Sequence, residues 1–280
     1  MKRILLAACL SLTPIASALA QQDDQATTGL DITEAEQRAA IRFAVENMQF
    51  VLMHEAAHLL MGEFEIPPGD DLETVADRFA ALQLLGSSDG GSTALIASAD
   101  GWRWSAGTDT GGQIDGAYMD VHNPDQRRAD AVVCLMVGSD PARFSAVAEL
   151  YSLDPSRQGD CANSSAAAGA ADDALFGPFA RDAHPELTEA VATRYEPGGA
   201  YQLIADALEQ SEVLETAARA VNARFAFARP ITFVAGVCDQ ENAFIDAENG
   251  SVTLCYELAD AFVRVYVENV LLGDQRLTPQ

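Results

Sequence analysis

The sequence predicts an α+β protein that is mostly helical, with a small antiparallel β-hairpin or meander near the C-terminus. Alanine is abundant, and apolar residues recur at steps of three and four over much of the chain, which favours helix. β-Branched residues gather only at 231–237 and 252–254, and an Asn-Gly turn signal lies between these two runs. With 280 residues, of which 49% are hydrophobic, the chain can bury a sizeable core.

The N-terminus has the features of an export signal. Two basic residues precede a largely apolar run over 4–16, and "SALA" at 17–20 supplies the small residues of a cleavage site. This pattern predicts a signal peptide over 1–20, cleaved after Ala20, and therefore a periplasmic or secreted protein.

Membrane attachment is the alternative interpretation of this segment. The apolar run is too short to span a bilayer comfortably, and no other stretch reaches the ~20 apolar residues that a spanning helix needs. "LAAC", which ends at Cys9, resembles a lipoprotein box, but the apolar run continues past it, so a lipid anchor is disfavoured. We expect a flexible N-terminus over 21–32 and a single domain over 33–280.

The first helix is expected from Thr33 to Gly62, because no Pro or Gly interrupts this stretch. Its last two turns are apolar nearly all round and should be buried on most sides. A Pro-Pro connector over 65–71 leads to a second helix, which should run from about Asp71 to Gly86.

The remaining elements are expected in the following order. A helical pattern resumes at 95–101, a loop covers 107–126, and short helices occupy 125–139 and 141–153. A flexible segment is expected at 155–172, an extended piece at 193–198, a helix at 200–227 and a final helix at 257–272. The β-containing region should therefore span about 190–272.

Four cysteines remain once the signal is removed. An even number in an exported protein indicates two disulfides, and four cysteines allow three connectivities. Free buried thiols are the alternative, whereas a zinc–thiolate cluster is disfavoured because the chain has no C-x-x-C. The preferred pairs, which close the shortest loops, are Cys134–Cys161 and Cys238–Cys255.

The net charge of −25 excludes one class of partner. A surface this acidic repels nucleic acid and anionic membranes, so no nucleic-acid partner is expected.

The stretch "FVLMHEAAHLL" (50–60) carries the chemistry. His54 and His58 lie one turn apart on one face of the first helix, so both imidazoles can reach one ion. Zinc suits neutral imidazole, and Glu55 beside the first histidine can act as general base towards the attacking water. This is the H-E-x-x-H pattern of zinc metalloproteases. A pair of hydrogen-bonded core histidines is the alternative.

The third ligand must come from elsewhere in the chain. The sequence after His58 has no third histidine at metzincin spacing, which excludes that class. Glu73 follows fifteen residues later on the next expected helix, and Asp77 comes one turn after it. This E-x-x-x-D spacing resembles the gluzincin pattern, which implies that Glu73 is the third zinc ligand and that Asp77 orients His54. A solvated acidic helix start is the alternative interpretation of the two carboxylates.

The resemblance extends beyond this site to a little-characterised family of exported bacterial zinc metallopeptidases. It runs from Phe50 nearly to Leu258 and implies a zincin-like core, a single Zn²⁺ ion and both neighbouring cysteine pairs, but no known substrate. Three positions depart from the family pattern: Ala57, Leu72 and Val121. None of them removes a proposed ligand. The matching blocks, in the same order as in the family, are "FVLMHEAAHLL", the E-x-x-x-D helix, "DVHNPDQRR", "VVCLMVGSDPARF", "CDQENAF" and "VTLCYEL".

A group that stabilises the oxyanion of the tetrahedral intermediate is also expected. His122 is the candidate, with Tyr118 and Arg127 near it in the sequence and Tyr256 as a further possibility. A surface loop histidine is the alternative interpretation of His122.

The sequence therefore predicts a zinc metalloendopeptidase that acts on a polypeptide substrate. Two alternatives stay open: a zinc hydrolase of a non-peptide bond, and a non-catalytic zinc-binding protein. Glu55 argues against the second alternative, because a purely structural metal site has no use for a base.

Overall fold

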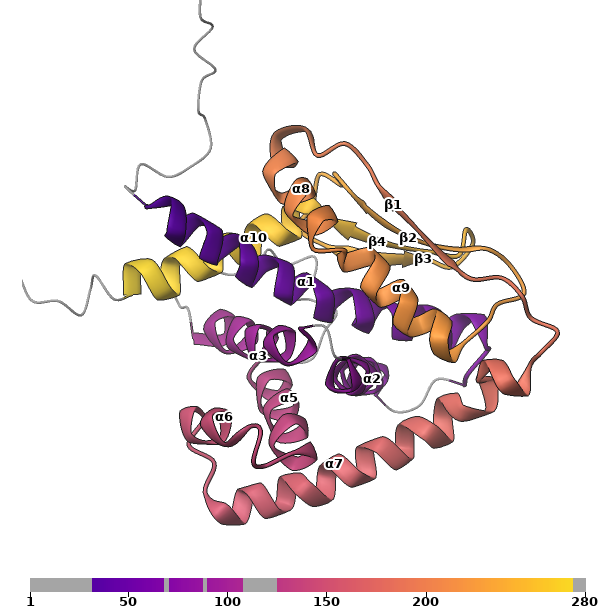
Figure 1. The fold of residues 1–280 in the computed structure, drawn as a ribbon, viewed down its shortest axis with the longest axis horizontal. Coiled ribbons are helices and arrows are strands. Elements are labelled where there is room, and N and C mark those ends of the chain that lie inside the picture. Colours follow the sequence, from indigo (N-terminus) through magenta and orange to yellow (C-terminus); the bar gives the residue numbers. More distant parts are fainter. Residues whose placement is uncertain (1–31, 68–70, 88–89, 108–124, 274–280) are drawn as a thin grey trace, which may run out of the picture. The chain divides into compact units, whose positions relative to one another are not determined.

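The computed structural model describes residues 32–67, 71–87, 90–107 and 125–273, and Figure 1 shows their fold. The helices and strands below all belong to one compact unit within Glu34–Gln280. The predicted signal peptide, nearly all of the predicted flexible N-terminus, and both His122 and Tyr118 lie outside the described residues. None of the helices in the described ranges is long and apolar enough to cross a membrane.

The described chain is mostly helical and has one small sheet in its C-terminal third, which confirms the α+β class. Short 3₁₀ turns follow α7 and precede α8, and one π-helical turn (Val267–Leu271) follows α10. The helices are α1 (Glu34–Glu63), α2 (Leu72–Gly86), α3 (Gly91–Gly107), α5 (Asp125–Ser139), α6 (Ser145–Leu150), α7 (Pro155–Phe176), α8 (Gln202–Gln210), α9 (Val213–Arg224) and α10 (Tyr256–Tyr266). The strands are β1 (Val191–Tyr195), β2 (Ile231–Gly236), β3 (Ala243–Asp246) and β4 (Ser251–Cys255).

The sheet is mixed, with the strand order β1-β2-β4-β3. The predicted hairpin is present, because β3 and β4 pair antiparallel around a turn in which Gly250 has a φ of +64°. The expectation of an antiparallel sheet holds only for this pair, since β2 lies parallel to both β1 and β4. The physical reason is that α8 and α9 connect β1 to β2, and a helical crossover returns the chain in the same direction.

Helix α1 is the central element of the fold. It packs against α2, α3, α9 and α10 and against strands β3 and β4, so that it runs between the sheet and the helices on its other side (Figure 1). Phe50, Val51 and Leu52 are fully buried in its second half. Each such side chain stabilises the fold by roughly 1.5–3 kcal/mol. The nearly all-apolar turns around His54 are therefore surrounded by protein, as their composition predicts.

Helix α7 replaces the flexible segment that we expected at 155–172. Asp154 caps this helix by accepting a hydrogen bond from the Arg157 backbone N–H at 2.9 Å, and Pro155 opens its first turn. The small residues that favoured a flexible interpretation are mainly alanine, which has the highest helix propensity. The helix expected at 200–227 is instead divided into α8 and α9 near Glu212, where φ is +49°.

Both predicted disulfides are formed. Cys134–Cys161 joins α5 to α7 with a Cα–Cα distance of 4.9 Å, and Cys238–Cys255 joins the chain after β2 to the end of β4 at 5.4 Å. Gly138 permits the first approach, because a Cβ there would lie 2.1 Å from the Cys161 carbonyl oxygen. For loops of this length each disulfide contributes about 3 kcal/mol by restricting the unfolded chain.

Candidate metal centre

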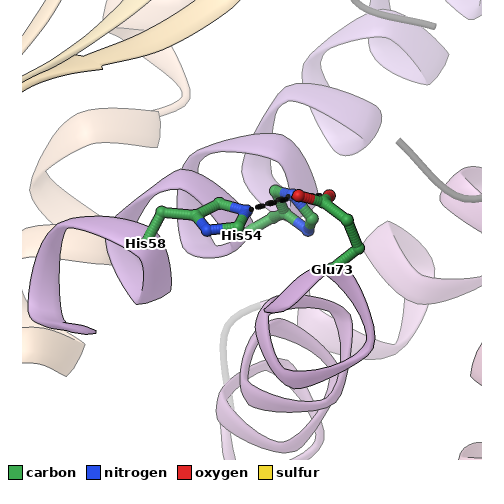
Figure 2. Close-up of side chains that lie close together, drawn as sticks. All are labelled: His54, His58 and Glu73. Carbon is green, nitrogen blue, oxygen red and sulfur yellow. Dashed lines mark hydrogen bonds and ion pairs between the residues drawn. The ribbon is translucent and has the colours of Figure 1, made fainter. Parts of the chain in front are cut away.

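Two adjacent helices bring three potential metal ligands together. Figure 2 shows the imidazoles of His54 and His58 on α1 facing the carboxylate of Glu73 on α2. Asp71 begins α2 by accepting a hydrogen bond from the Thr74 backbone N–H at 3.1 Å, which places Glu73 in the first helical turn. His54 is fully buried, and the side chains of His58 and Glu73 are only 17% and 23% exposed.

The distances among these three groups suit a small tetrahedral ion. The His54 Nε2 and His58 Nε2 atoms lie 3.1 Å apart, and each lies 3.3 Å from an oxygen of Glu73. Ligand atoms about 2.0–2.1 Å from a tetrahedral ion are themselves about 3.3 Å apart. His54, His58 and Glu73 can therefore hold one metal ion with little rearrangement.

The contact between His54 Nδ1 and Asp77 fixes the tautomer of the His54 ring. His54 Nδ1 lies 2.8 Å from Asp77 Oδ1, and an ionised carboxylate only accepts hydrogen bonds. We therefore assign the proton of the neutral ring to Nδ1, which leaves the Nε2 lone pair directed at Glu73. A cation, either a proton or a metal ion, is favoured between this lone pair and the Glu73 carboxylate.

The protonation states follow from the same contacts. Burial alone would raise the pKa of Asp77, but Arg128 and His54 outweigh it and hold this pKa well below its usual range. Burial alone would lower the pKa of His54, but hydrogen bonds to Asp77 and Glu73 outweigh it and raise this pKa. In the metal-free protein a proton on His54 therefore competes with the metal for the same nitrogen.

Arg128 completes the arrangement, and the sequence analysis did not identify it. Its Nε and Nη2 atoms donate to the two oxygens of Asp77 at 3.0 and 2.6 Å, and the guanidinium lies 4.2 Å from the centre of the Trp102 ring. Arg128 is only 1% exposed. Its Nη2 also lies 3.3 Å from His54 Nδ1, but both nitrogens carry hydrogen, so this is proximity rather than a hydrogen bond. Helical spacing is the sequence feature that indicates its burial, because Arg128 lies four residues before Val132 and shares its buried helix face.

Glu55 lies on α1 between the two histidines and is 5% exposed. Its carboxylate is not among the three groups that converge in the described chain. The structure therefore does not make Glu55 one of the ligand groups.

The other residues proposed from the sequence do not join this cluster. His122 and Tyr118 lie outside the described residues, and Arg127 is exposed on α5. Tyr256 is fully buried and donates a hydrogen bond to the Glu196 carbonyl oxygen at 2.8 Å, so it is not available to a substrate. Burial, with nearby carboxylates, raises the pKa of Tyr256 to about 12.

A second group with metal-ligating atoms consists of Cys238, Cys255 and Glu257. Its two sulfurs are joined in a disulfide, which removes the thiolates that a metal would need. The Glu257 carboxylate instead accepts hydrogen bonds from the backbone N–H groups of Cys238 and Asp239. This group is therefore structural.

Comparison with known proteins gives one match. A family model described as "Putative metallopeptidase" matches residues 9–171 and 197–277, which is most of the chain. Neither the curated proteins nor the solved structures contain a match.

Proposed function

Because the chain belongs to this metallopeptidase family, we propose that it is a periplasmic or secreted zinc endopeptidase that hydrolyses a polypeptide substrate. The observation that carries the proposal is the spacing of His54, His58 and Glu73, which suits one tetrahedral ion. Zinc is the ion that best fits two imidazoles and one carboxylate, with a fourth position left for water or substrate. The two disulfides support export, since such bonds persist in oxidising compartments.

The residues have distinct roles in this proposal. His54, His58 and Glu73 would hold the ion, which when bound supplies Lewis acidity to the scissile carbonyl and lowers the pKa of water. Glu55 accepts the proton of the attacking water and returns it to the departing amine. Asp77 keeps the Nδ1 proton on His54, so that Nε2 stays available as a ligand. The family membership favours peptide hydrolysis over a purely structural metal site.

Metal removal tests the proposal. The purified mature protein should cleave a mixed peptide library, lose this activity on dialysis against a chelator, and regain it with one equivalent of Zn²⁺. Zinc at 100 times its Kd should also stabilise the folded protein by about 2.7 kcal/mol. Mass spectrometry of the library and a thermal melt provide the two readouts. A stoichiometrically zinc-loaded protein that leaves the library intact would contradict the peptidase function but not the metal site.

Arg128 should tune the affinity of the proposed site for zinc. Replacing Arg128 by Lys keeps the charge beside Asp77 but removes the two parallel hydrogen bonds, which loosens the carboxylate that orients His54. We expect the zinc Kd, measured by chelator competition, to rise about 10-fold or more. Arg157→Lys, on the exposed start of α7, should leave this Kd unchanged. Equal Kd values for the two variants would show that Arg128 is only a structural residue.

A further inference from the structure

A groove lies between α2, α5 and α7, and it shares Asp77 and Arg128 with the metal centre but none of the three ligands. Its volume is about 590 Å³, which is within the range of small-molecule sites. Its walls are mostly apolar, and polar side chains complete them. Residues from all three helices line it, including Thr74, Arg78, Arg127, Val132, Leu135 and Ala168.

Two contacts fix the position of α7 against the other two helices that line the groove. The Cys134–Cys161 disulfide ties α7 to α5, and the Phe79 and Phe176 rings, 5.0 Å apart, pack the other end of α7 against α2. Figure 1 shows α7 crossing from α5 towards α2. The α7 residues that line the groove, Ser164 to Ala171, lie between these two contacts along the helix.

The charges in the groove favour an anion, although the whole chain carries a net charge of −25. Three arginines and two aspartates line it, and both aspartates are already engaged: Asp77 with Arg128, and Asp71 with the start of α2. In the described chain no carboxylate pairs with Arg78 or Arg127. The Nε atom of Arg78 is also buried without a hydrogen-bond partner. A buried donor of this kind costs about 1–3 kcal/mol unless a ligand satisfies it.

We propose that this groove binds a small carboxylate with an apolar body. Arg78 and Arg127 would engage the carboxylate, as arginine forks do, while Leu135 and Ala168 contact the hydrocarbon. A free alkanoic acid and the C-terminal residue of an apolar peptide share this chemistry. The inference does not depend on the proposed peptidase activity, because the groove uses none of the three metal ligands.

Octanoate and octanamide provide a matched pair of probes for titration calorimetry on the mature protein, with and without added zinc. We expect octanoate to bind at least about 10-fold more tightly than octanamide, since one charged hydrogen bond is worth roughly that factor. Arg78→Gln combined with Arg127→Gln should remove this preference. Arg194→Gln, an exposed change on β1, should keep it.

A second variant separates loss of binding from loss of folding. Ala168→Trp fills the groove from the partly exposed face of α7, so it should abolish octanoate binding while zinc affinity and melting temperature stay close to wild type. Stronger binding of N-acetyl-Ala-Leu as the free acid than as the amide would identify a peptide terminus as the source; octanoate binding alone would identify a free acid. Absence of binding by both acids, or equal binding of acid and amide, would overturn the proposal.

Discussion

Replacing Glu55 by Gln is expected to lower kcat/KM for peptide cleavage by about 10²–10⁴-fold, the usual contribution of a general base. The amide is nearly isosteric with the carboxylate but cannot accept the proton of the attacking water. Because Glu55 is not one of the three converging ligand groups, the zinc Kd should stay within about threefold of wild type. Steady-state cleavage of a fluorogenic peptide and chelator competition measure the two quantities.

Glu46→Gln is the matched control for this change. Glu46 is a partly buried glutamate on the same helix, so the control makes the same chemical change away from the three converging groups. It should leave kcat/KM and zinc affinity unchanged. Full activity in Glu55→Gln would remove Glu55 from the role of base, whereas joint loss of activity and zinc in that variant would point to a structural effect.

The metal centre could be predicted from sequence because its spacing is local. His54 and His58 share a helix face whatever the rest of the chain does, and Glu73 follows them across one short connector. Arg128 could not be placed in the same way. Helical spacing puts Arg128 on the face of Val132, but its hydrogen bonds to Asp77 join residues 51 positions apart, and a single sequence does not show that pairing.

The fold shows the same division between local and long-range information. The β3–β4 hairpin follows from an Asn-Gly turn, and α1 and α2 follow from their periodicity and caps. The parallel pairing of β1 with β2 depends on how α8 and α9 pack, which no local pattern records. In α7 the Ala-, Ser- and Gly-rich composition favours a flexible segment, whereas the Asp154–Pro155 start, which the structure uses, favours a helix.

The clearest test of the ligand set is Glu73→Ala. The free energy of zinc binding to such sites is about 10–16 kcal/mol, and the three protein ligands supply much of it. Loss of one ligand should therefore weaken zinc binding by roughly 3 kcal/mol or more. This corresponds to a zinc Kd at least about 100-fold weaker, measured by chelator competition, and activity at limiting zinc should fall in parallel. Glu149→Ala, an exposed glutamate on α6, controls for the lost charge.

The alternative for Glu73 is that it only stabilises the start of α2, where a carboxylate interacts favourably with the helix dipole. That role is worth about 0.3–1 kcal/mol and predicts a lower melting temperature of the metal-free protein with no change in zinc Kd. A ligand role predicts a weaker zinc affinity. The contact of Glu73 with His54 also stabilises the metal-free protein, so both roles lower its melting temperature, but only loss of a ligand leaves a variant that gains little from added zinc. Melting curves recorded with and without Zn²⁺ therefore separate the two roles within one experiment.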